Sequence, residues 1–206
     1  MREVKNPEVR KAEIMQAAKK LFYEKGYLNT TTQDIIKSLN ISRGLLYYHF
    51  DSKEDILFSI VEKHTEPLLK KFNIIANNKK LTVKEKVKSF LDSTIISESS
   101  AEQEDYAVHD AIQLPENSFM MDKINHKLSY NMAKCFADII KEGNEEGILN
   151  VEYPEELSAY LMTAYTFVIS DKHFHKNDFE KASKYLKAFK HLLNQTLNSK
   201  ELLFDL

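Results

Sequence analysis

The sequence has few residues of the kinds that interrupt helices or form cross-links. Only 4 glycines and 4 prolines occur among 206 residues, which favours long helices over strands and turns. The single cysteine, Cys135, excludes an internal disulfide and a thiolate metal site, and it suits a reducing compartment. No apolar run approaches the roughly 20 residues of a membrane span, and the first residues lack a secretion signal's apolar core. We therefore expect a cytoplasmic, all-α protein with no membrane segment.

Arginine is scarce, and its placement is uneven. The three arginines, Arg2, Arg10 and Arg43, all lie in the first 43 residues. Residues 1–53 carry ten Lys or Arg against six Asp or Glu, whereas the whole chain has a net charge of -2. The planar fork of arginine matches phosphates and guanine edges. The basic charge of residues 1–53 and the acidic charge of the remaining chain suggest that residues 1–53 bind an anionic partner. Chance could also gather three arginines in one region.

The sequence lacks the short motifs of common enzyme sites. Its histidines show no HExxH spacing, and neither a GxSxG motif nor a phosphate-binding loop is present. The pair in "HFH" at 173–175 could hold a metal, but alternation in a loop points the two rings apart. We therefore expect no metal, no cofactor and no catalytic residues. An enzyme and a helical protein-interaction bundle remain the two rival classes.

The first 53 residues contain signals for three helices. An apolar stripe at i, i+3, i+4 spacing predicts a helix over 8–25, and Gly26 suits the left-handed residue that ends it. Thr31 and Asp34 form a capping-box pattern at the start of a short second helix. Ser42 can cap a third helix, after a turn at a residue that tolerates the left-handed conformation. Two short helices joined by a tight turn and braced by a long one are the parts of a helix-turn-helix.

The rest of the chain is also expected to be helical, which makes about nine helices in all. "DSKED" restarts a helix after Phe50, and the acidic residues there suit its N-terminal dipole. Polar breaks separate most of the later helices. Five more are expected at roughly 82–97, 102–113, 118–146, 154–171 and 178–199.

Residues 10–60 resemble the TetR (tetracycline-repressor-like) family of bacterial transcriptional regulators. The segment "IMQAAKKLFYEKGYLNTTTQDIIKSLNISRGLLYYHFDSKEDIL" follows the family's order of motifs, and "IIKEGNEEGIL" is similar to the end of the family's long seventh helix. The resemblance implies a helix-turn-helix DNA-binding domain over 1–53 and a helical effector-binding and dimerisation domain over 54–206. It implies a homodimeric regulator, not an enzyme: a repressor released from a palindromic operator in double-stranded DNA by a small apolar effector. Leu45 departs from the family, which often has a small hydroxyl residue there.

An outward set of polar side chains in the helix-turn-helix suits DNA. Arg43 can fork onto guanine in the major groove, whereas Tyr47 and His49 can donate to phosphates. Free N–H groups at the start of the second helix also favour phosphate. The expected DNA-binding residues are Thr32, Gln33, Arg43, Gly44, Tyr47, His49 and Lys53.

Gly44 and Tyr48 need separate arguments. Glycine in a helix costs about 1 kcal/mol relative to alanine, which argues for a close backbone approach at Gly44. That approach could be to DNA or to the second helix. Tyr48 is expected to pack between the third and fourth helices.

The apolar residues of the middle and the end of the chain can fill a core or serve a ligand and a partner. The resemblance implies a ligand pocket in the middle, and the expected lining residues are Phe90, Tyr106, His109, Met121, Tyr130, Met132 and Tyr165. It also implies a four-helix dimer interface near the C-terminus, for which the expected residues are Leu161, Tyr165, Tyr185, Phe189, Leu192 and Leu193. Ordinary core packing is the alternative for both sets.

Overall fold

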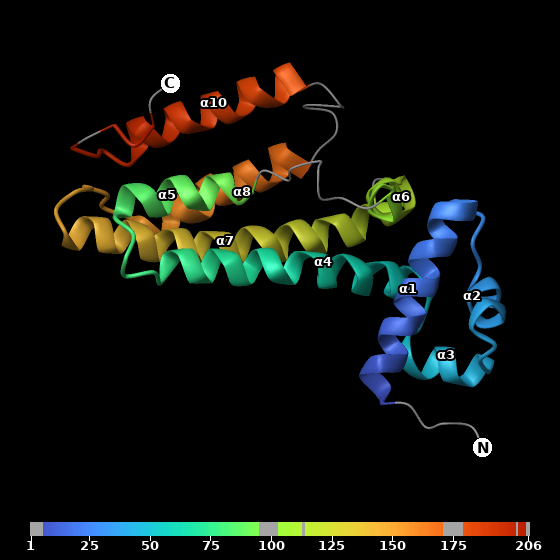
Figure 1. Cartoon of the computed structure of the whole chain (residues 1–206). Coiled ribbons are helices and arrows are strands. Elements are labelled where there is room, and N and C mark those ends of the chain that lie inside the picture. The colour runs from blue at the N-terminus through green and yellow to red at the C-terminus, as the bar shows by residue number, and fades with distance from the viewer. Residues whose placement is uncertain (1–5, 95–102, 113, 171–178, 201, 205–206) are drawn as a thin grey trace. The chain divides into compact units, whose positions relative to one another are not determined.

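A computed structural model describes residues 6–94, 103–112, 114–170, 179–200 and 202–204 (Figure 1). This part of the chain forms nine α-helices and a short 3-10 turn, without a strand. The expected all-α fold is confirmed. None of the helices among these residues is both long and apolar enough to cross a membrane.

The chain divides into two compact units, and unit 1 comprises residues 1–65 and 97–122. Unit 2 comprises residues 66–96 and 123–206, and two long helices, α4 and α7, contribute to both units. The elements of unit 1 are α1 (Pro7–Lys25), α2 (Thr32–Leu39), α3 (Arg43–His49), the start of α4 (Lys53–Ala76), α6 (Gln103–Ile112), η2 (Pro115–Asn117) and the start of α7 (Ser118–Glu145). The functional boundary expected at residue 53 stays a prediction.

Local sequence signals set the ends of the first three helices. Asn6 caps α1, and its side-chain oxygen accepts a hydrogen bond from the Glu8 N–H at 2.9 Å. Gly26 ends α1 at a φ of 79°, which side chains other than glycine rarely adopt. Asn40 ends α2 in the left-handed conformation, with φ 50° and ψ 45°. The ends at Gly26 and Asn40 agree with the sequence prediction, because each depends on one or two neighbouring residues, whereas the Asn6 cap was not predicted.

The core of unit 2 contains three aromatic rings in contact. Its other helices are α5 (Val83–Asp92), α8 (Pro154–Ser170) and α10 (Phe179–Thr196). The ring of Phe90 lies 4.4 Å from that of Phe72 and 5.4 Å from that of Phe136, measured between centroids. All three side chains are buried. The expected helix over 82–97 is shorter than predicted and ends at Asp92.

A buried ion pair joins α5 to α7 within unit 2. The Lys86 ammonium lies 2.6 Å from each carboxylate oxygen of Glu142, and the Lys86 side chain is 0% exposed. A buried ammonium is tolerated only when it is paired in this way. This pair could not be predicted from the sequence, because lysine usually indicates an exposed position and its partner lies 56 residues away.

Candidate nucleic-acid interface

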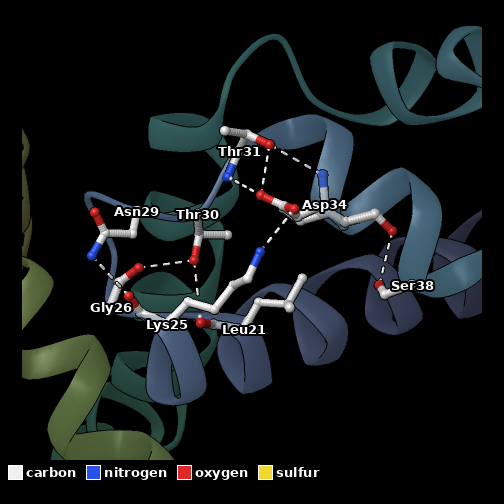
Figure 2. Close-up of polar contacts among 9 residues, drawn as sticks. Leu21, Lys25, Gly26, Asn29, Thr30, Thr31, Asp34 and Ser38 are labelled. Atoms are coloured by element: carbon white, nitrogen blue, oxygen red, sulfur yellow. Dashed lines mark hydrogen bonds and ion pairs between the residues drawn. The ribbon is translucent and has the colours of Figure 1, made fainter.

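The N-terminus of α2 is fixed by a capping box and an ion pair (Figure 2). The Thr31 hydroxyl accepts a hydrogen bond from the Asp34 N–H at 3.2 Å, and the Asp34 carboxylate accepts one from the Thr31 N–H at 2.9 Å. The ammonium of Lys25, the last residue of α1, donates to the same carboxylate at 2.9 Å. The bond from Lys25 and the bonds from Thr31 hold the pKa of Asp34 well below its usual range. The two helices are thereby tied where α2 begins.

We expect the Asp34→Asn variant to unfold more readily than the wild type at neutral pH, and this difference to shrink in acid. Because the pKa of Asp34 is lower in the folded chain, its stabilising effect is complete above the unfolded pKa of about 3.9 and is lost as the pH falls further. Urea unfolding at pH 7 and near pH 3 measures both differences. Asp122→Asn, at an exposed carboxylate in the same unit, is the control. A difference that stays constant or grows in acid would contradict the assignment.

Helix α3 is capped at its N-terminus and buries one face in unit 1, so its opposite face is exposed to solvent. The Ser42 side-chain oxygen accepts a hydrogen bond from the Leu45 N–H at 3.2 Å, which starts the helix. Leu46, within the helix, and Phe50, just after it, are buried in unit 1. Arg43 and Gly44 are exposed on the first turn. The arrangement leaves the first turn of α3 free to approach a ligand.

Tyr47 connects the exposed groups of α2 and α3. Its hydroxyl lies 3.2 Å from the Thr32 hydroxyl oxygen at the start of α2. Its ring centroid lies 5.4 Å from the guanidinium carbon of Arg43, one turn earlier in α3. Gln33 is exposed next to Thr32, and His49 is partly exposed. The structure thus brings Thr32, Arg43 and Tyr47 together, and contacts of this kind reduce the side-chain entropy lost on binding.

The expectation for Tyr48 was wrong. Its side chain is 75% exposed and does not pack between α3 and α4; its ring lies edge-on to that of His49, with centroids 4.9 Å apart. At about 100° per residue, Tyr48 lies roughly 200° around the helix from the buried Leu46, so it must point outward. Helical geometry could have revealed this from the sequence. Tyr48 joins the exposed groups that could meet DNA.

Lys53 is held inward at the start of α4. Its ammonium donates to the Tyr27 backbone carbonyl at 2.8 Å and lies 4.1 Å from the centroid of the Tyr27 ring. The Tyr27 hydroxyl donates to Glu54 at 3.1 Å, and burial, followed by the charge of Glu54, raises the pKa of Tyr27. Lys53 therefore has an internal role that the sequence did not reveal. Its contact with phosphate stays a prediction.

The surroundings of Gly44 separate the two explanations for this glycine. A methyl group built on Gly44 would meet nothing within 4 Å, so no tight contact with α2 requires glycine there. Its φ lies outside the left-handed region in which glycine is favoured. The close approach of DNA at Gly44 stays a prediction.

We therefore expect Gly44→Ala to fold normally and to bind DNA poorly. Alanine should raise the free energy of unfolding by up to about 1 kcal/mol, because it favours the helix more than glycine does. A methyl group facing the DNA backbone should weaken binding by about fivefold or more, as a misfit of about 1–3 kcal/mol does. Thermal unfolding and fluorescence anisotropy with an operator duplex measure the two effects. Unchanged DNA affinity would show that the glycine does not serve close approach.

The residues expected to line a ligand pocket, where the structure describes them, are divided between the core and the surface. Phe90, Met132 and Tyr165 are buried in the packed core of unit 2, whereas Tyr130 is exposed on α7. Met121 is partly exposed. The expected positions Tyr106 and His109 lie outside the residues whose side chains the structure describes. A ligand site among these residues stays a prediction, and core packing accounts for the three buried ones.

The residues expected at a dimer interface divide into two groups. Leu161, Tyr165 and Leu193 are buried by their own chain, because the apolar stripes of α8 and α10 also face the core of unit 2. We no longer expect these three to meet a partner directly. The other group is at least partly exposed on α10: Tyr185, Phe189 and Leu192.

Helix α8 carries an exposed apolar face that the sequence did not single out. Tyr160 and Phe167 are 78% and 53% exposed. They lie seven residues apart, hence on one side of α8. Exposed aromatic side chains in such a row are typical of a surface that meets a partner.

No group of His, Cys, Asp or Glu among the described residues is arranged to hold a metal. The HFH pair at 173–175 lies outside these residues.

Comparison with known proteins identifies the family. The model of bacterial regulatory proteins of the tetR family matches residues 14–60, and that of the tetracyclin repressor-like C-terminal domain matches residues 98–192. The chain belongs to the TetR family. It is a TetR-family transcriptional regulator with a helix-turn-helix DNA-binding domain, in a family of regulators rather than enzymes.

The DNA-binding region of this TetR-family chain also resembles that of IcaR, a negative transcriptional regulator of a biofilm operon. IcaR of Staphylococcus epidermidis is 52% identical over 52 residues, which are 25% of this chain and 28% of IcaR. IcaR of Staphylococcus aureus is 56% identical over 46 residues, which are 22% of this chain and 25% of IcaR. The match thus spans about a quarter of the curated relatives' length.

Solved structures of TetR-family regulators share the fold over nearly the whole chain. SmeT, the repressor of the Stenotrophomonas maltophilia multidrug efflux pump SmeDEF, has a TM-score of 0.67 at 17% identity, covering 95% of this chain and 93% of SmeT. A regulator from Pectobacterium atrosepticum gives 0.63 at 19% identity, with 95% and 98% covered. A complex of SmeT with triclosan gives 0.56 at 16% identity, with 96% and 95% covered. At these identities the likeness shows the fold alone.

Proposed function

We propose that this TetR-family regulator is a homodimeric repressor that binds a palindromic operator and is released by a small, largely apolar molecule. The observation that carries the proposal is the exposed cluster of Thr32, Arg43 and Tyr47 on α2 and α3, held together by the contacts of Tyr47. Arginine is the side chain best suited to guanine in the major groove, and hydroxyl groups suit phosphates. IcaR, whose similarity covers this region, is a negative regulator, which supports repression.

A dimer follows from the small size of the cluster. One helix-turn-helix makes too few contacts for tight, specific binding, whereas two copies on a palindrome double them. The exposed Tyr160 and Phe167 of α8, with Leu192 of α10, supply an apolar surface for the second copy.

Release by a ligand would act through α4. This helix begins next to the DNA-binding helices at Lys53 and continues into unit 2 as far as Ala76. A ligand that binds in unit 2 and displaces α4 would change the spacing of the two recognition helices in the dimer. Two successive major grooves lie about 34–36 Å apart, so a shift of a few ångströms would break simultaneous contact. Release by a factor of 100 requires about 2.7 kcal/mol of coupling. The complex of SmeT with triclosan supports a small-molecule effector.

Selection from a pool of random DNA duplexes tests the DNA-binding part of the proposal. We expect the wild type to enrich a palindrome and the Arg43→Ala/Tyr47→Phe variant to enrich none. Equal enrichment by the two proteins would overturn the assignment of this surface.

A thermal-shift screen of apolar compounds, followed by operator binding with each hit, tests the effector. Hits that stabilise the protein but leave operator affinity unchanged would refute the coupling. They would still establish that the protein binds such ligands.

A further inference from the structure

The exposed face of α3 is divided into a polar row and an apolar row. At about 100° per residue, Tyr47 and Leu45 lie about 100° to either side of the buried Leu46. The side of Tyr47 also carries Arg43, whose guanidinium carbon lies 5.4 Å from the centroid of the Tyr47 ring. The side of Leu45 carries Tyr48, three residues later in the helix. The proposed function uses the polar row, Arg43 and Tyr47, and leaves the apolar row, Leu45 and Tyr48, without a role.

The polar row is the one next to α2. The Tyr47 hydroxyl lies 3.2 Å from the Thr32 hydroxyl oxygen at the start of α2. The apolar row therefore lies on the side of α3 that faces away from the start of α2. Between the rows is Gly44, and a methyl group built on it would meet nothing within 4 Å. Because no side chain separates the rows, one partner can contact both of them at once.

The apolar row is accessible and partly ordered before any partner binds. Tyr48 is 75% exposed, and Leu45 is partly exposed. The Tyr48 ring lies edge-on to the His49 ring, with centroids 4.9 Å apart. This contact reduces the side-chain entropy that Tyr48 would lose on binding. Removing the exposed apolar surface of the row from water would be favourable, so the row suits an apolar group of a partner.

The major groove of DNA presents one apolar group, the 5-methyl group of thymine. Arg43 and the apolar row belong to the same helix, so the row enters the groove in which Arg43 contacts a base edge. The 7 residues of α3 are about 10.5 Å long, which corresponds to about three base pairs at 3.4 Å each. The row can therefore reach a thymine within about three base pairs of the base that Arg43 contacts.

We propose that Leu45, together with the ring of Tyr48, contacts the methyl group of a thymine in each half-site of the operator. Leu45 is thereby a specificity-determining residue, and it distinguishes thymine from bases that lack the methyl group. The inference rests on the DNA binding proposed above and adds a second base position to the one assigned to Arg43. Burial of one methyl group should contribute about fourfold in affinity.

The operator that the wild type selects from random duplexes provides the probe. Uracil is placed for thymine at one symmetric pair of positions at a time, which removes only the two methyl groups, and anisotropy titrations give the Kd. We expect one pair at which uracil raises the Kd about fifteenfold, or about fourfold for each methyl group. This pair should lie within about three base pairs of the position at which Arg43→Ala loses discrimination. At the same pair, 5-methylcytosine should bind more tightly than cytosine, because it restores the methyl group.

Three variants assign the effect to the apolar row through the ratio of the Kd for uracil to the Kd for thymine. Leu45→Ala should bring this ratio close to one. Tyr48→Phe keeps the ring and should retain the wild-type ratio, which separates an apolar contact from a hydrogen bond by the hydroxyl. Leu28→Ala removes an exposed apolar side chain from the turn between α1 and α2 and should also retain it. A general loss of affinity or stability changes both Kd values alike and leaves the ratio unaltered.

The inference is overturned if uracil and thymine bind equally well at every pair within about three base pairs of the position assigned to Arg43. It is also overturned if the selected operator has no thymine there, or if Leu45→Ala retains the wild-type ratio. In each of these cases the wild type still selects an operator, so the proposed function stands. A wild type that selects no sequence would instead overturn both the DNA-binding proposal and this inference.

Discussion

Operator binding by the Arg43→Ala variant is expected to be at least about thirtyfold weaker than that of the wild type. A forked contact to guanine contributes about 1–3 kcal/mol, and a dimer would lose one such contact in each half-site. Discrimination at one base position of each half-site should also relax. Arg43 is exposed, and its guanidinium lies against the ring of Tyr47, so its removal should not unfold the chain.

Two further variants make this test specific. Arg43→Lys keeps the positive charge but cannot make two parallel hydrogen bonds to guanine. Its operator affinity should therefore lie closer to that of the wild type than its discrimination between bases does. Lys20→Ala removes an exposed positive charge from α1 of the same unit and should leave both unchanged. Anisotropy titrations with duplexes that vary at each base position measure these effects. An Arg43→Ala protein with the wild-type base preference would show that another side chain reads the sequence.

The Phe167→Lys variant is expected to be monomeric and to lose operator binding at the same time. A charge in the exposed apolar face of α8 would have to be desolvated in a dimer, which is unfavourable without a partner charge. A single helix-turn-helix should then bind at about the non-specific level, which is typically 10³-fold or more weaker than specific binding. Light scattering gives the mass, and operator titrations give the affinity.

The control is Ile74→Lys, which places the same charge at an exposed apolar position of α4 in unit 2. It should remain dimeric and bind DNA normally. Far-UV circular dichroism should show native helix content for both variants, because neither side chain is buried. A dimeric Phe167→Lys protein would exclude this face of α8 as the interface, and a monomeric wild type would exclude the dimer.

The first three helices could be predicted closely because their ends depend on local chemistry. Thr31 with Asp34 and Ser42 with Leu45 form caps within four residues, and Gly26 has the positive φ that its position suggested. The family of the chain was also evident from this region. In contrast, the hydrogen bond from the Lys53 ammonium to the Tyr27 carbonyl joins residues that are 26 positions apart, and no local sequence pattern predicts it.

The apolar helices of unit 2 could be located but not assigned a role from the sequence. Leu193 fits the stripe of an interface helix, yet it is a core residue, because a stripe does not say whether the partner is the same chain or another.

The pair formed by Lys86 and Glu142 constrains how this protein can change during evolution. Loss of Glu142 leaves the buried Lys86 ammonium without its partner, which typically destabilises a protein by about 3–5 kcal/mol, whereas replacement of both by apolar residues is often harmless. The intermediate with one substitution would therefore be selected against in a protein of ordinary stability. Descendants of this gene should either keep both residues or change both together. Substitutions at positions 86 and 142 should thus occur together in related sequences, although 56 residues separate the two positions in the chain.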